Sequence, residues 1–242
     1  MLPFPRISEY GNVAKNWYTG SNVVLAFDSN NFIPNTNFND YKSKIISIDK
    51  QNASSPNPTL NTGVASPYGS GIALYGALLV AGSSQIPPSF STSSFTIDMW
   101  YSQSSTAGIE FIPYGMYRQL APNDNKYLLW FYGVDTQGMR YQNNGANIIR
   151  PKSNYSSLFT STWKHIAYVY DSTSNMNYFF INGILVDSFT YTVASPASAT
   201  ICGVGGHVNS PSGTVHSIVE RVRFRTGAVW TENFDINNIY PI

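Results

Sequence analysis

The carboxylates of this chain are few and scattered. Glycoside hydrolysis by a retaining enzyme needs two carboxyl groups about 5 Å apart, one of them protonated as the general acid. The chain has four glutamates, and Glu110 and Glu220 lie in different expected strands, with no neighbouring carboxylate to pair with either. Glu220 alternates with Val222 onto an apolar side, which suits a buried or interface carboxylate hydrogen-bonded to a loop. We therefore predict no catalytic residues and no enzyme.

The sequence also gives little indication of a nucleophilic active site or of a metal site. The only histidines are His165, His207 and His216, and no Gly-x-Ser-x-Gly turn is present. His207 and His216 flank a Ser/Pro/Gly loop, but two histidines without a neighbouring carboxylate are a weak metal site. Cys202, the single cysteine, lies in an apolar run and is predicted to be a small buried side chain.

The segment Asp171–Asn177 superficially resembles a calcium-binding loop, but its residues do not support one. Asp171, Thr173, Asn175 and Asn177 form an alternating row of oxygen-bearing side chains. A single carboxylate is little charge for an ion that takes six to eight oxygen ligands. The segment is better interpreted as a polar hairpin loop, so no cofactor and no metal are predicted.

One central stretch has the chemistry of a sugar site. Carbohydrates stack on exposed aromatic faces and hydrogen-bond to amide or charged groups. The candidate carbohydrate-binding residues are Tyr114, Tyr117, Arg118, Trp130, Tyr132, Asn143 and Asn144. Tyrosine and tryptophan are also enriched at protein contacts, so a tyrosine-rich interface is the alternative and the favoured interpretation.

Composition restricts the partners. Of 242 residues, 14 are Lys or Arg and 13 are Asp or Glu, so the net charge is +1, and charged residues make up 11% of the chain. Near-zero net charge argues against electrostatic capture of nucleic acid or of an anionic membrane. Aromatic residues reach 15%, which excludes a disordered chain.

The pattern that positions these residues is that of strands. Short β-branched and aromatic runs are bounded by Gly, Pro, Asn and Ser, which indicates an all-β, antiparallel two-sheet jelly-roll sandwich. The expected strands are Val23–Phe27, Lys44–Ile48, Gly71–Leu79, Phe95–Tyr101, Tyr127–Tyr132, Trp163–Tyr170, Tyr178–Ile181, Ile184–Tyr191, Thr200–Val204 and Thr214–Arg225.

Local signals refine this arrangement. Asn182–Gly183 predicts a tight hairpin. In Phe95–Met99 alternate apolar residues predict one buried face and one wetter face. In Ile218–Arg225 strict alternation puts Ile218, Glu220, Val222 and Phe224 on one side and Val219, Arg221, Arg223 and Arg225 on the other. Gln51–Gly71 is expected to be a polar loop. Residues 1–20 are expected to form an extended N-terminal arm, and residues 21–242 a single domain.

Several motifs together resemble one family. They are Phe95–Trp100 (FTIDMW), Trp163–Tyr170 (WKHIAYVY), Tyr178–Val186 (YFFINGILV), Ile201–Gly206 (ICGVGG) and Ile218–Phe224 (IVERVRF). In this order they resemble the laminin G-like jelly roll of the concanavalin A-like lectin/glucanase superfamily. The tail Val219–Phe234 is similar to the ending of many bacteriophage members, although Val219 stands where the family usually has Asp. The Glu-x-Asp-x-x-Glu strand of the glucanase branch is absent from the sequence.

The resemblance implies a non-enzymatic virion structural protein of a bacteriophage, a capsid-decorating or tail-associated domain. Its expected location is the virion, and its expected partners are other virion proteins and further copies of itself. Burial of large arm side chains would supply adhesion, at roughly 1.5–3 kcal/mol each. These assembly residues are Leu2, Phe4, Ile7, Tyr10 and Trp17. The alternative is a carbohydrate-binding receptor-recognition protein that contacts host surface glycans.

Overall fold

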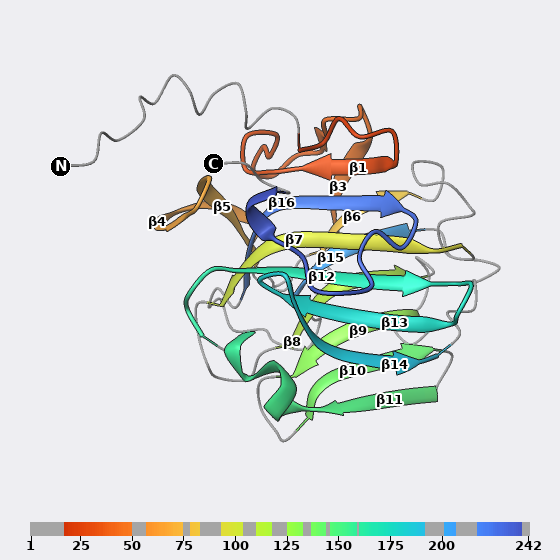
Figure 1. Cartoon of the computed structure of the whole chain (residues 1–242). Coiled ribbons are helices and arrows are strands. Elements are labelled where there is room, and N and C mark those ends of the chain that lie inside the picture. The colour runs from red at the N-terminus through yellow and green to blue at the C-terminus, as the bar shows by residue number, and fades with distance from the viewer. Residues whose placement is uncertain are drawn as a thin grey trace.

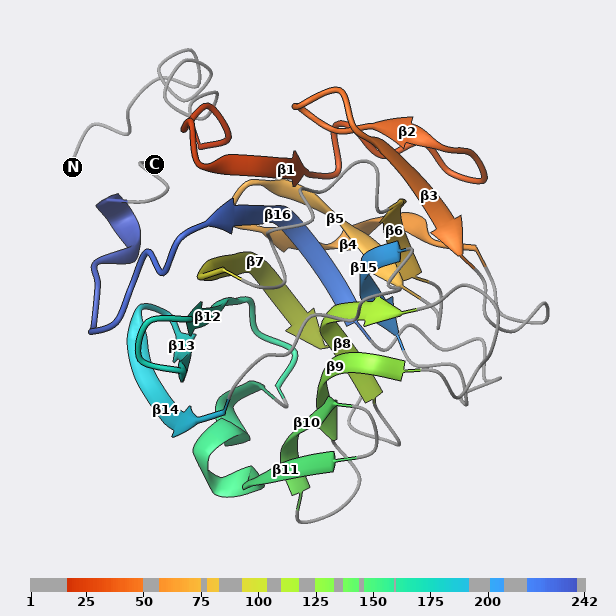
Figure 2. The same ribbon diagram turned by 90° about the vertical axis from the view of Figure 1, so that its right-hand side faces the viewer.

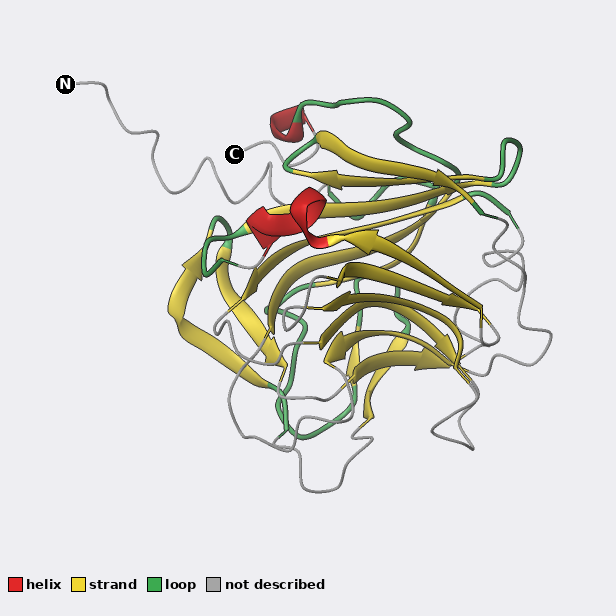
Figure 3. Cartoon of the chain, turned by 90° about the horizontal axis from the view of Figure 1, so that it is seen from below, coloured by secondary structure: helices red, strands yellow, loops and turns green. Residues whose placement is uncertain are grey.

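The computed structural model describes residues 17–49, 57–74, 78–82, 93–103, 110–117, 125–132, 137–143, 146–158, 160–191, 201–206 and 217–238. Along much of the second sheet, from β8 to β11 above all, it describes the backbone alone. Within these residues, strands make up nearly all the regular structure (Figure 3). The predicted all-β antiparallel sandwich is confirmed.

Two eight-stranded antiparallel sheets form the two layers (Figures 1 and 2). Sheet A consists, in spatial order, of β14 (Ile184–Thr190), β13 (Met176–Ile181), β12 (Lys164–Asp171), β7 (Phe95–Gln103), β16 (Ser217–Thr226), β5 (Gly69–Leu74) and β4 (Thr59–Ser66), with β1 (Val23–Phe27) also paired to β16. Sheet B consists of β11 (Ala146–Pro151), β10 (Gln137–Asn143), β9 (Asn125–Tyr132), β8 (Glu110–Tyr117), β15 (Ile201–Gly206), β6 (Leu78–Gly82), β3 (Ile45–Asp49) and β2 (Phe38–Asn39). The short helices are η4 (Lys152–Leu158) and η5 (Ile236–Asn238).

The inner faces of the two sheets enclose the main core. Phe95, Ile97, Met99 and Tyr101 of β7 point into it and are at most 2% exposed. Their neighbours Thr96 and Asp98 point the other way, yet both are 0% exposed. The prediction of a wetter second face is therefore wrong for β7, because a further layer covers the outer face of sheet A.

The hairpin prediction is confirmed. Ile181 of β13 pairs with Ile184 of β14, and the turn between them is Asn182–Gly183. Both turn residues have positive φ, 51° and 79°, which Asn and Gly tolerate best. Strands β12, β13 and β14 follow one another as antiparallel neighbours, as the sequence indicates.

Three local predictions fail. The expected strand Gly71–Leu79 is two strands, β5 in sheet A and β6 in sheet B, because a continuous apolar run does not show where the chain changes layer. The expected loop Gln51–Gly71 contains β4 and the start of β5. The sequence pattern does not predict strands β2, β8, β10 and β11, because their polar and glycine residues weaken the strand signal.

A bulge breaks the expected alternation in β16. Arg221 has a φ of 50°, and the pairing with β7 shifts between Glu220 and Arg223. Val219, Val222 and Phe224 consequently face the core. Glu220 is the register partner of Trp100, and Arg223 is the partner of Asp98, on the outer face. One extra residue reverses the side on which each later residue lies.

Candidate functional site

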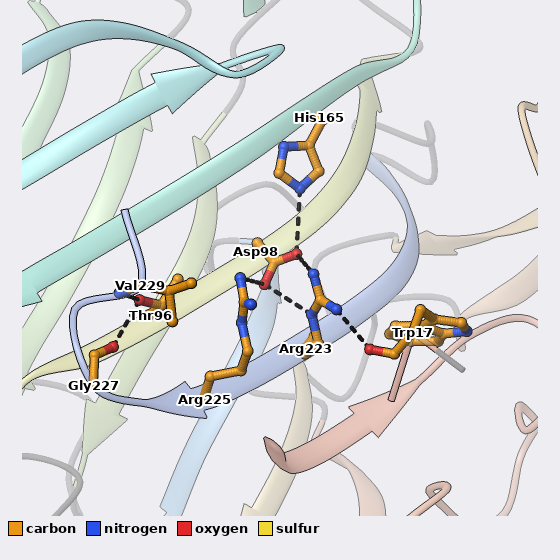
Figure 4. A network of polar contacts seen from close by, with 8 residues as sticks. All are labelled: Trp17, Thr96, Asp98, His165, Arg223, Arg225, Gly227 and Val229. Atoms are coloured by element: carbon orange, nitrogen blue, oxygen red, sulfur yellow. Dashed lines mark hydrogen bonds and ion pairs between the residues drawn. The ribbon is translucent and has the colours of Figure 1, made fainter. Parts of the chain in front are cut away.

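A buried ionic network lies at the centre of the outer face of sheet A (Figure 4). Asp98 of β7 accepts hydrogen bonds from Arg223 Nε (3.1 Å) and Nη2 (2.7 Å). Arg225 Nη2 lies 3.1 Å from Asp98 Oδ1, and His165 Nε2 lies 3.3 Å from Asp98 Oδ2. Asp98 and His165 are both 0% exposed. Strands far apart in sequence thus meet at one carboxylate.

The network sets the charge of its members. Burial alone would raise the pKa of the Asp98 carboxyl, but the Arg223 and Arg225 guanidinium groups offset this and hold it well below its usual range. Burial lowers the pKa of His165, and the attraction of Asp98 opposes that effect only in part. Asp98 is therefore the carboxylate, and His165 is a neutral ring at neutral pH.

The segment Gly227–Asn238, which we call the C-terminal strap, covers this network. In Figure 1 the dark blue segment after β16 crosses in front of β7 and β12. Trp230 and Phe234 stack on each other with centroids 4.1 Å apart and lie edge-on to His165. The Arg225 guanidinium lies 4.1 Å from the centre of the Trp230 ring, a close cation–π contact. The aromatic rings of the strap thus cover the charged cluster.

Hydrogen bonds to the backbone of the strap hold it at its start and near its far end. At its start, Thr96 Oγ1 donates to the Gly227 carbonyl (2.8 Å) and accepts from Val229 N–H (3.0 Å). At its far end, Phe234 N–H donates to the Gly183 carbonyl of the β13–β14 turn (2.9 Å). A Cβ at Gly183 would collide with the Phe234 carbonyl oxygen. Glycine at this turn therefore serves both the hairpin and the strap.

The N-terminal segment Trp17–Gly20 seals the neighbouring part of the face. The Trp17 carbonyl accepts a hydrogen bond from Arg223 Nη1 (2.6 Å), and its ring packs edge-on with those of Tyr18 and Tyr41. Ile236 of the strap packs against the same cluster. Trp17 is 6% exposed. The side chain of Trp17 is thus buried within its own chain, and its predicted role in adhesion to a neighbouring subunit stays a prediction.

The other assembly residues lie outside the described residues. Leu2, Phe4, Ile7 and Tyr10 belong to residues 1–16, so their role stays a prediction. Of the predicted arm, only Trp17–Gly20 is described, and it packs against sheet A.

Glu220 does have a carboxyl partner, contrary to the sequence interpretation. Asp28, which follows β1, lies close enough to raise the pKa of Glu220, in addition to the larger effect of burial, to about 8. Glu220 accepts hydrogen bonds from Ser29 N–H (2.9 Å) and Ser29 Oγ (3.2 Å). The predicted buried carboxylate bound to a loop is thus confirmed. Glu220 is 0% and Asp28 3% exposed, so in this conformation no substrate reaches the pair.

Metal ligands do not gather in the described part of the chain. There, no group of three or more His, Cys, Asp or Glu side chains is placed to hold a metal ion. Asp171 accepts hydrogen bonds from Thr173 N–H and Ser174 Oγ, as in a polar hairpin loop. His207 and His216 lie outside the described residues, and Cys202 is described by its backbone in β15.

The predicted sugar-site residues belong to sheet B. Tyr114 and Tyr117 are in β8, Trp130 and Tyr132 in β9, and Asn143 in β10. Arg118 and Asn144 lie outside the described residues. The structure therefore brings the five described positions to three adjacent strands, β8, β9 and β10.

The register separates these positions by face. Met139 is 0% exposed in the core and is the partner of Phe131. Because directly paired residues share a face and successive residues alternate, Trp130 and its partner Arg140 take outer positions. Tyr114, paired with Leu129, takes an inner position. The backbone register thus gives Tyr114 and Trp130 positions on opposite faces, and the role of the set in sugar binding stays a prediction.

Sequence reasoning missed the network and its cover. The available signal was three arginines at alternate positions, Arg221, Arg223 and Arg225, in a strand otherwise apolar, with a lone Asp98 in another strand. If both strands are buried, these arginine and aspartate side chains must form ion pairs, because an unpaired buried charge is strongly destabilising. The strap gave no such signal, since Trp230 and Phe234 stand in a loop-like sequence.

Comparison with solved structures agrees with this architecture. The crystal structure of the botulinum neurotoxin serotype D binding domain matches with a TM-score of 0.61 and 14% identity, over 90% of this chain and 51% of that chain. The binding domain of botulinum neurotoxin DC, solved with rat synaptotagmin II, gives 0.57 and 12%, over 90% and 50%. A Trypanosoma rangeli sialidase gives 0.55 and 13%, over 91% and 32%. At such identities the likeness shows the fold alone, and this chain spans about half of the neurotoxin domains and a third of the sialidase.

The sequence comparisons identify the family. No curated protein sequence matches the chain. The family model described as the concanavalin A-like lectin/glucanases superfamily matches residues 80–228, which is more than half of the chain and includes most strands of both sheets. This chain belongs to the concanavalin A-like lectin/glucanases superfamily and is a lectin-like jelly-roll domain.

Proposed function

We propose that this chain is a non-enzymatic binding domain that recognises carbohydrate through the outer face of sheet B. The observation that carries the proposal is the sealing of the other sheet. Ala167, Val169 and Phe180 on the outer face of sheet A are 0% exposed beneath the strap. The centre of this face is therefore closed to a ligand.

Sheet B offers the contrasting surface. Ile46 of β3 is 1% exposed in the core, whereas the adjacent Ile45, on the outer side, is 49% exposed. Further along the same face the register aligns Val80, Gly203, Gly115 and Leu128 on four adjacent strands. Gly115 and Gly203 are direct register partners on this face, and Leu128, the partner of Gly115 on β9, precedes Trp130 by two residues.

Two related findings fit a binding role. The neurotoxin domains with this fold are described as binding or receptor-binding domains. In this chain the carboxyl pair Asp28–Glu220 is buried, which favours binding over hydrolysis. We propose further that no metal takes part.

A glycan screen of the purified chain tests the proposal. We expect discrete binding to a subset of glycans and its loss in Tyr132→Ala, since Tyr132 shares the outer side with Trp130. Tyr114→Phe, at an inner position, is the control and should keep the affinity within about twofold. Absence of binding to every glycan, with the chain folded, would refute the proposal.

A second candidate function is a structural protein of a bacteriophage virion, attached through protein–protein contacts to other virion proteins and to further copies of itself. The observation that favours it is the position of the two described chain ends. Trp17 and Ile236 pack in one cluster on the sheet A side. Attachment through this side and recognition through sheet B would use opposite faces. The bacteriophage-like ending of the sequence supports the virion as the location.

The test of this candidate is the mass of the full chain in solution, compared with that of a chain lacking residues 1–16. The truncation keeps Trp17, because removal of its buried ring would itself destabilise the domain. Discrete oligomers of the full chain and a monomer after truncation would support adhesion by the arm. Monodisperse monomers in both cases would contradict it.

A further inference from the structure

We propose that the C-terminal strap is an acid-released cover over sheet A, and that protonation of His165 beneath it causes the release. Release would expose the outer face of sheet A, where Ala167, Val169 and Phe180 are 0% exposed in the closed form. Strap release is independent of carbohydrate binding, because the proposed sugar site lies on the other sheet.

The site of His165 suits a neutral ring. Its side chain is 0% exposed, and Nε2 lies 3.3 Å from Asp98 Oδ2. That carboxylate already accepts two hydrogen bonds from Arg223 and lies 3.1 Å from Arg225 Nη2. In Figure 4 both arginines approach the carboxylate from the side away from the imidazole. A protonated His165 would be a third cation around one buried carboxylate, so the closed form disfavours it.

Uncharged groups form the rest of the described surroundings of the imidazole. They are Trp100 of β7, Asn182 of the β13–β14 turn, and Trp230 and Phe234 of the strap. The aromatic rings have no hydrogen-bond acceptor, since the indole only donates and the phenyl ring has no polar atom. Glu232 and Asp235, the two carboxylates of the strap, are exposed. The closed strap therefore gives an imidazolium no compensating partner.

Acid consequently favours the open strap. Burial lowers the pKa of His165 from its ordinary value of 6.5, and the attraction of Asp98 opposes that effect only in part. In the open form water reaches the ring, so the open form binds the proton more tightly. As the pH falls below 6.5, the closed form loses stability relative to the open form, by at most about tenfold in the equilibrium per pH unit.

The strap can open without separating the strands beneath it. Strand β12, which carries His165, is paired along its length with β7 on one side and β13 on the other. The strap is held by hydrogen bonds at its start, beside Thr96, and near its far end, at Gly183 and Leu185. It begins at Gly227, which is exposed and has a φ of 88°. Opening about Gly227 breaks fewer interactions than unpairing β12, so it is the less costly way to hydrate the ring.

Hydrogen exchange of the full chain at about pH 7.5 and pH 5, corrected for the intrinsic exchange rate at each pH, measures the opening. The reporters are the N–H groups of Val229 and Phe234, which are bonded to Thr96 and Gly183 in the closed form. We expect their protection to fall about tenfold or more on acidification, while that of β12 and β13 changes less than about twofold. His165→Gln cannot take up a proton in this range and should abolish the fall.

Matched controls come from the other two histidines of the chain. His207→Gln and His216→Gln should keep the full response. Gly183→Ala retains His165 and disturbs the strap contact, so it should move the loss of protection to higher pH. This second variant keeps the test valid if His165→Gln does not fold.

Four results would overturn the proposal. They are equal strap protection at both pH values, equal loss of protection in strap and strands, a response that survives His165→Gln, and an unshifted response in Gly183→Ala. The second of these would indicate acid unfolding of the whole domain, and the third would assign the response to another titratable group.

Discussion

The outer faces of the two sheets differ in what covers them. On sheet A, the segment Trp17–Gly20 and the C-terminal strap lie against the face, where Asp98, His165 and Phe180 are completely buried. On sheet B, an outer residue of β3, Ile45, is half exposed. Sheet A is thus the middle layer of three, and its charged residues act in stability. The difference teaches that charge and aromatic content do not by themselves mark a binding face, because a cluster rich in both is buried beneath the strap.

The largest expected effect is the loss of the carboxylate that organises sheet A. Asp98→Ala leaves two guanidinium groups buried without their shared anion, and we expect a loss of about 3–5 kcal/mol of unfolding free energy. Urea unfolding measures it. Asp171→Ala, which removes a carboxylate from an exposed turn, should cost about 1 kcal/mol or less. Equal costs for the two variants would mean that the buried network contributes nothing special.

The attachment of the strap is tested by two glycines with positive φ. Gly183→Ala brings both backbone strain and a collision with the Phe234 carbonyl, whereas Gly227→Ala, at φ 88°, meets nothing within 4 Å. Strain of this kind costs about 1–3 kcal/mol at either site. Gly183→Ala should be the more destabilising by about 1 kcal/mol, the value of the hydrogen bond it disturbs. Chemical unfolding gives the difference, and a smaller cost at Gly183 would contradict the strap contact.

The third prediction concerns pH and the carboxyl pair beside sheet A. Because the folded pKa of Glu220, about 8, is above its ordinary value of 4.5, its contribution to stability is complete below pH 4.5 and is lost as the pH rises to 8. The loss is at most about 1.4 kcal/mol per pH unit. Glu220→Gln cannot ionise, so its stability relative to the wild type should increase from pH 5 to pH 8.

Unfolding in urea at several pH values measures this difference. Glu232→Gln, on the exposed surface of the strap, is the matched control and should follow the wild type. If the difference in unfolding free energy between Glu220→Gln and the wild type stays constant across this pH range, Glu220 does not keep its proton in the folded state up to a pKa of about 8.

The smallest effect on stability is expected on sheet B. Trp130→Ala should change the unfolding free energy by less than about 1 kcal/mol and weaken glycan binding tenfold or more, since a stacked ring is lost. Trp230→Ala, the same substitution under Arg225 on sheet A, should do the reverse, with a loss of about 1–3 kcal/mol and unchanged glycan affinity. Calorimetry of unfolding and of glycan binding on the two variants compares the faces directly. If both variants lose stability and glycan affinity to the same extent, the two sheet faces do not differ in role.

The sequence by itself determined the class of fold and its most local parts. The alternation in Phe95–Tyr101 and the Asn182–Gly183 dipeptide specify strands and a turn through short-range sterics and face-by-face burial, and both are found in the structure. The order of the family motifs likewise sufficed to name the jelly roll. These features depend on residues close in the chain, which is why a sequence can show them.

Only the tertiary structure decided what each face is for. The bulge at Arg221 reverses the alternation of β16, and a single left-handed residue leaves no periodic signal in advance. Trp17, Asp98, Arg223 and Trp230 are far apart in sequence and meet only because the chain ends fold back over sheet A. Burial of a charge requires a partner, but the sequence does not say which one, since that choice depends on strand order and register. For the same reason Tyr114 and Trp130, similar in sequence context, take opposite sides of sheet B.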